Sequence, residues 1–381
     1  MAMPDRSVET LIAQTFLEIA DRLEGGTRLS RVKIAVTGIG SEHGEENVLA
    51  GALIARRTGV EVIYIGTLLA EGVQTVRAET AEAAQARMEA LLASGEADGA
   101  VTMHYPFPIG VATVGRAITP GRGREMYIAS TTGTASADRV EAMVRNAVIG
   151  IAAAKACGTG NPKVGILNIE GAVQVEAALK RLRQNGYAIE FADSARADKG
   201  CLMRGNDLLS GACDVMLCDS LTGNIVMKTL SSFTTGGSYE SLGSGYGPGL
   251  GEGFEKLVLI VSRASGAPVI AGAIEYAAAL AEGDYRGCLK RELEQAKRAG
   301  LGELLGSRKP AAVVIPKPAK EVVVYEITGI EVMHIEEAAQ SLWQAGIYAE
   351  SGMGCTGPVI LVSERNAEAA ETILRTQGWR A

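Results

Sequence analysis

Hydrophobic positions along this chain follow two spacings that alternate from one segment to the next. Runs of consecutive apolar residues, such as 32–36 and 60–65, predict buried strands, whereas apolar residues three or four positions apart, as in 8–23, predict amphipathic helices. Strands that alternate with helices of this length are typical of a parallel sheet covered by helices on both faces. The pattern predicts an α/β fold with three layers, α/β/α, and a mainly parallel sheet.

These predictions cover most of the first 300 residues. The predicted strands are residues 32–36, 60–65, 99–103, 126–129, 163–168, 188–191 and 215–218. The predicted helices are residues 8–23, 45–58, 78–92, 137–156, 172–185, 199–210, 254–262, 269–281 and 289–299.

One segment, residues 231–253, is too rich in glycine to predict regular structure. A long loop of this kind is usually either functional or disordered. Two interpretations therefore stay open: a mobile lid or ligand-facing loop, and a disordered surface loop.

The last 70 residues predict a separate small α+β unit. The predicted order is strand 321–327, helix 331–345, strand 347–350, turn 351–358, strand 359–362 and helix 367–376, which resembles part of a ferredoxin-like unit. The sequence Ser307-Arg308-Lys309-Pro310 interrupts the pattern before it. We therefore expect a body at 1–306 and a C-terminal appendage at 311–381.

Composition and charge narrow the function. The net charge is −7 and the basic residues are scattered, which argues against general affinity for nucleic acid or anionic membranes. The chain starts without a signal-peptide pattern, and its apolar runs are shorter than the roughly 20 residues that span a bilayer. We expect a cytoplasmic protein that binds neither nucleic acid nor membrane.

Six cysteines occur without any CxxC pair, and three histidines lie far apart in the sequence. In a reducing cytosol such cysteines are free thiols. We expect no metal site and no bound cofactor.

Cys355 is the cysteine in the most reactive setting, the glycine-rich turn at residues 351–358. Glycines allow the N–H groups around Gly354 and Thr356 to converge and stabilise a thiolate or an acyl oxyanion. The alternative is a half-buried cysteine in an ordinary hairpin.

A second group of polar residues, 219–228, follows a predicted strand and opens a predicted helix. Free N–H groups at a helix start, together with Ser220, Thr222, Asn224 and Lys228, suit a phosphate ion. Asp219 or Ser220 could equally be an ordinary helix N-cap.

Two further polar loops are expected at the same sheet edge. One contains Ser130, Thr131 and Thr132, and the other contains Ser41 and His43. Hydroxyl groups suit phosphate, and a histidine suits acid–base work near neutral pH. His104, which also follows a strand, is an equal candidate, whereas His334 is interpreted as structural.

Three motifs together resemble a known family. These are Gly40-Ser41-Glu42-His43-Gly44, the 219–224 turn with Lys228, and Gly354-Cys355-Thr356-Gly357-Pro358. The chain resembles the alpha subunits of component C of the glycine/sarcosine/betaine reductase complex. Its body is similar to the phosphate acyltransferases of fatty acid and phospholipid synthesis, and more distantly to phosphotransacetylases. The C-terminal unit with Cys355 is the more specific feature, because the wider superfamily lacks it.

The resemblance implies an isopropylmalate-dehydrogenase-like fold and an acyltransferase that releases acetyl phosphate. Inorganic phosphate is then the co-substrate, and Cys355 carries the acetyl group as a thioester. It also implies an oligomer with a ketoacyl-synthase-like beta subunit and a selenoprotein acyl donor. Two alternatives remain: a phosphate acyltransferase that uses acyl-carrier protein or coenzyme A, and a non-catalytic scaffold for a thiolase-like partner.

Overall fold

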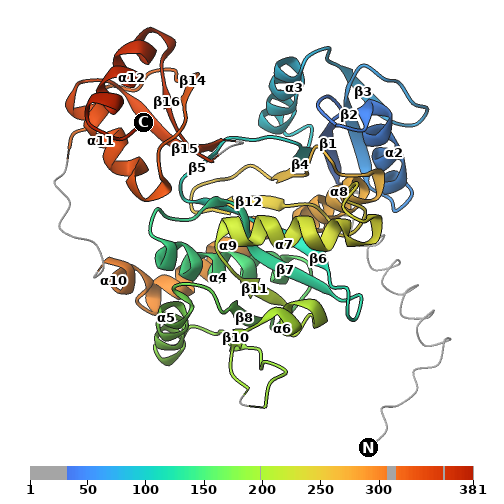
Figure 1. The fold of residues 1–381 in the computed structure, drawn as a ribbon. Helices are drawn as coiled ribbons and strands as arrows, with labels where there is room; N and C mark the ends of the chain where they lie inside the picture. Colours follow the sequence, from blue (N-terminus) through green and yellow to red (C-terminus); the bar gives the residue numbers. More distant parts are fainter. Residues whose placement is uncertain (1–31, 198, 307–314, 355–356, 381) are drawn as a thin grey trace, which may run out of the picture.

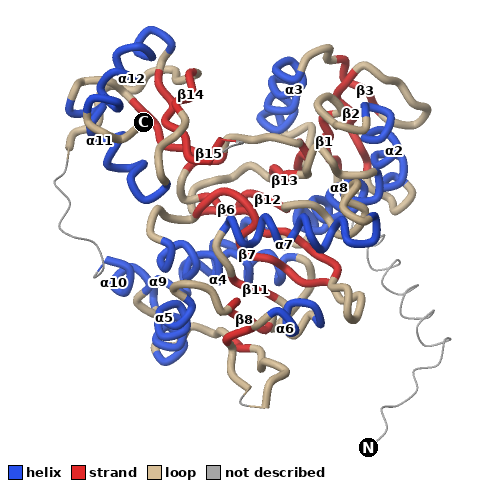
Figure 2. Tube along the Cα trace, viewed as in Figure 1, coloured by secondary structure: helices blue, strands red, loops and turns tan. Residues whose placement is uncertain are grey.

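The computed structural model describes residues 32–197, 199–306, 315–354 and 357–380. A sheet of 12 strands crosses the body in the order β10-β8-β11-β7-β6-β12-β13-β4-β1-β2-β3, with β9 beside β8. Most neighbouring strands are parallel, and β6 and β12 are the antiparallel members in the middle of the sheet. Helices lie on both sides of the strands, which confirms the predicted α/β fold class (Figures 1 and 2).

The elements of the body have the following bounds. The strands are β1 Lys33–Thr37, β2 Glu61–Gly66, β3 Gln74–Arg77, β4 Gly99–Thr102, β5 Phe107–Pro108, β6 Val111–Ile118, β7 Glu125–Thr134, β8 Lys163–Leu167, β9 Glu190–Phe191, β10 Leu202–Met203, β11 Val215–Leu217, β12 Gly247–Gly251 and β13 Val258–Ile260. The helices are α2 Gly44–Arg56, α3 Ala81–Ser94, α4 Arg139–Ala156, α5 Ala172–Gln184, α6 Gly205–Ser210, α7 Ser220–Ser232, α8 Ala267–Glu282, α9 Tyr285–Arg298 and α10 Leu301–Gly306, with a 3₁₀ turn at Phe233–Thr235.

Alternate residues of the strands belong to different hydrophobic clusters, because successive side chains of a strand point to opposite faces. Ile34 and Val36 pack with residues of α2, α4, α5, α8 and α9. Ala35, between them, packs with α3. Farther along the sheet, apolar residues of α7 pack with residues of β7 and β11 in a third hydrophobic cluster.

Part of the glycine-rich segment is regular structure, contrary to the prediction, whereas Tyr246 just before it lines a cavity described below. Residues 247–251 form β12 in the middle of the sheet and are buried, so they are neither a lid nor a surface loop. A Cβ atom on Gly247 would lie 1.7 Å from the carbonyl oxygen of Val114. The glycines are therefore needed because neighbouring backbone comes too close for a side chain. The helix predicted at 254–262 is also wrong, since Val258–Ile260 is strand β13.

The C-terminal unit has a core and a small sheet of its own. Its elements are β14 Tyr325–Ile327, α11 Ile335–Gln344, β15 Ala349–Gly354, β16 Gly357–Val362 and α12 Ala367–Thr376, with 3₁₀ turns at Val332–His334 and Glu364–Asn366. Most of the turn predicted at 351–358 is therefore paired strand. The helix predicted at 8–23 and the interruption at 307–310 lie outside the described residues.

The body contributes an edge strand to this small sheet. Its order is β14-β16-β15-β5, and Met353 of β15 pairs with Phe107 of β5. Ile109 of the body also packs against the C-terminal core. The C-terminal unit, red in Figure 1, is thus docked on the body beside β5. No described helix is long and apolar enough to cross a membrane.

Candidate functional site

Two adjoining cavities lie between the sheet, α7 and the C-terminal hairpin. Their volumes are about 250 and about 530 Å³. Both are lined by Thr132, Gly133, Asn224, Met353 and Gly354. Residues from three distant parts of the sequence therefore meet at one place.

Helix α7 starts at the wall of the larger cavity, which Asp219, Ser220 and Asn224 line. Asp219 is the N-cap: its carboxylate accepts hydrogen bonds from the Thr222 N–H at 3.0 Å and the Thr222 hydroxyl at 2.8 Å. Asp219 and Thr222 thus stabilise the start of the helix. Of the predicted phosphate donors, Ser220 and Asn224 line the larger cavity. The N–H group of Thr222 is thus taken by the cap, whereas those of Ser220 and Leu221, which have no partner within a helix, are suited to attract an anion.

Gly223 explains why α7 can start so close to the sheet. A Cβ atom at this position would lie 1.8 Å from the carbonyl oxygen of Ser130. Because only glycine permits this approach, the 219–224 motif and the Ser130 segment are brought to the same cavity.

The segment with Ser130, Thr131 and Thr132 is part of strand β7, not the predicted loop between strand and helix. The pairing of β6 with β7 jumps from Gly133 to Ala129, so these residues bulge from the ladder, and bulges redirect side chains. All three line the larger cavity. The Thr131 hydroxyl is already bonded to the carbonyl oxygen of Tyr246 at 2.6 Å, so its role is structural.

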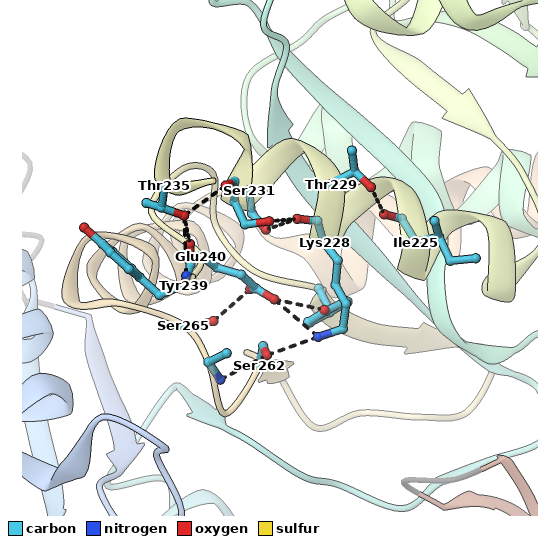
Figure 3. A network of polar contacts seen from close by, with 12 residues as sticks. Ile225, Lys228, Thr229, Ser231, Thr235, Tyr239, Glu240, Ser262 and Ser265 are labelled. Atoms are coloured by element: carbon cyan, nitrogen blue, oxygen red, sulfur yellow. Dashed lines mark hydrogen bonds and ion pairs between the residues drawn. The ribbon is translucent and has the colours of Figure 1, made fainter. Parts of the chain in front are cut away.

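Lys228 lies two turns into α7 and lines the smaller cavity. Its Nζ is 3.6 Å from the Glu240 carboxylate and 3.4 Å from the Ser262 hydroxyl (Figure 3). The ammonium group also stands 5.8 Å from the ring centre of Tyr246. The side chain remains 55% exposed, which leaves a cation available to an anion in the cavity.

The two candidate histidines occupy different places. His104 lines the smaller cavity, and burial lowers the pKa of its imidazole, with a weaker opposing effect of Glu326 on β14. It is therefore neutral near pH 7 and able to accept a proton. His43 is exposed, its ring stands 5.9 Å from that of Tyr239, and neither it nor Ser41 lines these cavities. The geometry favours His104 over His43.

Cys355 and Thr356 lie outside the described residues. The strands that flank them are described: β15 ends at Gly354, β16 begins at Gly357, and both glycines line the larger cavity. The described ends of the two hairpin strands therefore meet the main sheet at the larger cavity.

Comparison with known proteins shows the family of this chain. A family model described as "Fatty acid synthesis protein" matches residues 32–361. The chain belongs to this family. The alpha subunit of component C of the glycine/sarcosine/betaine reductase complex from Peptoclostridium acidaminophilum is 53% identical over 97% of this chain and 98% of that protein. The resemblance predicted from the motifs is confirmed.

Two further similar proteins have lower sequence identity. A phosphate acyltransferase from Thermus thermophilus is 27% identical over 52% of this chain and 70% of that protein. Among solved structures, a branched-chain phosphotransacylase from Enterococcus faecalis is 15% identical, with a TM-score of 0.47 over 66% of this chain and 99% of that chain.

Sequence reasoning missed several residues of the site. Ser262 was hidden because β13 was predicted as part of a helix, and Glu240 and Tyr246 because they lie in the glycine-rich segment. Asn146 of α4 lines the larger cavity while only 2% exposed, and its Oδ1 has no hydrogen-bond partner among the described residues. A buried polar atom of this kind usually serves a ligand or a water molecule.

Proposed function

We propose that this chain transfers an acetyl group from a cysteine thioester to inorganic phosphate and releases acetyl phosphate. One observation carries the proposal: Lys228, Asn224 and the start of α7 line the same pair of cavities as Gly354 and Gly357, the glycines on either side of Cys355. Direct attack requires that phosphate and the acyl-carrying thiol share one site, and the shared lining of these described residues supports that.

Phosphate is held by the Lys228 ammonium, the Asn224 amide and the N–H groups at the start of α7. A phosphate oxygen attacks the carbonyl carbon of the acetyl group on the Cys355 sulfur. The tetrahedral intermediate collapses, the new C–O bond remains, and the C–S bond breaks with the thiolate as leaving group. The products are acetyl phosphate and free Cys355.

His104 supplies the proton transfer in this proposal. Hydrogen phosphate loses one proton when it becomes acetyl phosphate, and the leaving thiolate gains one. A neutral imidazole in the same cavity is suited to accept the first proton and deliver it to the sulfur. Burial keeps His104 in that neutral form.

The 53% identical relative is named as a subunit of a multi-component complex. By analogy we propose that a ketoacyl-synthase-like subunit and a selenoprotein acyl donor supply the acetyl group to this chain. The phosphate acyltransferase relatives favour a second candidate, direct transfer from a soluble thioester to phosphate without Cys355.

The deciding experiment is arsenolysis of acetyl phosphate by the intact chain. Arsenate drains the acetyl-enzyme because acetyl arsenate hydrolyses spontaneously. Cys355→Ala is expected to abolish turnover, and mass spectrometry is expected to find a thioester on Cys355 of the wild type. Cys288→Ala is the control, since this half-buried cysteine of α9 lies outside both cavities. Undiminished turnover by Cys355→Ala, measured with coenzyme A added as a soluble thiol acceptor, would favour direct transfer.

A further inference from the structure

We propose that Glu240 is a positioning residue that fixes the Lys228 ammonium so that it presents one N–H donor to the phosphate ion. The inference rests on the proposed role of Lys228. Glu240 lies in the glycine-rich segment, and no sequence motif pointed to it. The proposal rests on its position beside the Lys228 ammonium, toward which the Glu240 side chain points (Figure 3).

The Glu240 carboxylate is itself held firmly. The residue is 4% exposed, and its two oxygens accept hydrogen bonds from the Tyr246 hydroxyl at 3.2 Å and the Ser265 hydroxyl at 3.0 Å. Its backbone is fixed as well: its N–H donates to the Ala264 carbonyl and its carbonyl accepts from the Gly266 N–H. A carboxylate with this many contacts is a rigid anchor for a mobile lysine.

The lysine has three N–H donors and a flexible stem. Within the part of the chain that the structure describes, its polar contacts are Glu240 at 3.6 Å and Ser262 at 3.4 Å. The Ser262 contact is a hydrogen bond and the Glu240 contact is an ion pair, so the ammonium is held from the protein side and still has a donor for the cavity that Lys228 lines. Lysine otherwise loses much side-chain entropy when it grips a ligand, so ordering it in advance favours phosphate binding.

A second effect of Glu240 has the opposite sign. Its negative charge, close to the lysine, repels a phosphate dianion in the same cavity. If repulsion dominated, removal of the charge would tighten phosphate binding; if positioning dominates, removal weakens it. The direction of the change therefore distinguishes the two roles.

The test is the exchange of labelled inorganic phosphate into acetyl phosphate, measured with the full chain. Glu240→Gln keeps the shape and removes the charge. We expect the KM for phosphate to rise roughly tenfold, as when one charge-assisted hydrogen bond is misdirected, with a smaller fall in kcat. An unchanged or lowered KM would overturn the proposal.

Ser262→Ala provides a second arm that leaves the buried carboxylate in place. It removes the other tether of Lys228 and is expected to raise the KM for phosphate by a smaller factor; no change in that KM together with an inactive Glu240→Gln would also count against the proposal. Glu292→Gln is the matched control, because Glu292 is equally buried and also pairs with a lysine and a tyrosine. It is expected to leave the KM unchanged.

Lys228→Met separates this inference from the proposed function. If Lys228→Met raises the KM for phosphate and Glu240→Gln does not, the phosphate site stands and the positioning role fails. If Lys228→Met itself leaves the KM unchanged, the phosphate site is elsewhere.

Discussion

The molecule contains two networks built from the same three residue types, and they do different work. In one, Lys228, Glu240 and Tyr246 meet at the smaller cavity. In the other, Lys155 of α4 lies 2.6 Å from Glu292 of α9, which also accepts a hydrogen bond from the Tyr187 hydroxyl at 2.9 Å. Both glutamates are buried, at 4% and 3% exposed.

The difference lies in the lysine. The Lys155 side chain is 25% exposed and in close contact with its carboxylate, whereas Lys228 is 55% exposed and 3.6 Å from its partner. Burial and the neighbouring glutamate raise the pKa of both tyrosines, which therefore stay protonated and donate. The inner network joins two helices, while the network at the cavity leaves part of its cation open to a ligand.

The largest expected effect comes from removing each lysine. Lys155→Met leaves Glu292 buried without its counter-charge, which typically costs about 3 to 5 kcal/mol of unfolding free energy. Lys228→Met breaks a longer and more exposed pair, so we expect a loss of about 1 kcal/mol or less. Urea unfolding of the two variants measures this contrast.

The loss of activity should be larger in Lys228→Met than in Lys155→Met, which is the reverse of the order expected for the loss of stability. Phosphate exchange is expected to be nearly lost in Lys228→Met and nearly normal in folded Lys155→Met. Equal losses of stability, or a loss of exchange in both variants, would show that the two networks do not differ in the way their exposure indicates.

The next largest effect is expected from a substitution in α7 that displaces the Lys228 network and leaves the Lys155 network in place. Gly223→Ala places a Cβ atom where the Ser130 carbonyl lies, so α7 must shift and carry Lys228 with it. We expect a destabilisation of about 1 to 3 kcal/mol, typical of overpacking, and a higher KM for phosphate. Differential scanning calorimetry and phosphate exchange are the measurements.

Gly302→Ala in α10 is the control for that substitution, because a Cβ atom there meets nothing within 4 Å. Alanine at such a helical position is expected to be neutral or stabilising by up to about 1 kcal/mol. A Gly223→Ala protein as stable and active as Gly302→Ala would contradict the tight approach of α7 to the sheet.

Sequence reasoning found the parts of this molecule whose signals are local. The alternation of strands and helices and the 219–228 junction were predictable because N-cap chemistry, apolar spacing and turn residues coincide there. Asp219 caps α7, as one of the two interpretations held.

The other parts depend on contacts between distant residues. Strand β12 has almost no hydrophobic pattern, since its glycines are dictated by neighbouring backbone such as the Val114 carbonyl. Glu240 and Ser262 reach Lys228 only after the sheet has formed, and no spacing in the chain reveals it. His104 and His43 were equal candidates because both follow a strand; only the folded chain separates them.

The smallest expected effect concerns His104 and His43. It tests whether protonation of the histidine at the smaller cavity makes the stability of the protein depend on pH. Burial lowers the pKa of His104 below the value of about 6.5 that it has when unfolded. As the pH falls below about 6.5, the unfolded chain binds a proton that the folded chain resists, so the native state loses stability. Above pH 7 both states are neutral at this residue and its contribution is constant.

His104→Gln removes this slope, so we expect the wild type to lose more stability than the variant between pH 7 and pH 5.5 in chemical unfolding. Phosphate exchange by the variant should also be slower at pH 7, because glutamine cannot carry the proton from phosphate to the sulfur. His43→Gln serves as the control, since that residue is exposed and lies outside both cavities. If His43→Gln slowed exchange and His104→Gln did not, proton transfer would belong to the α2 loop, and the Lys228 network would be a phosphate site without an adjacent base.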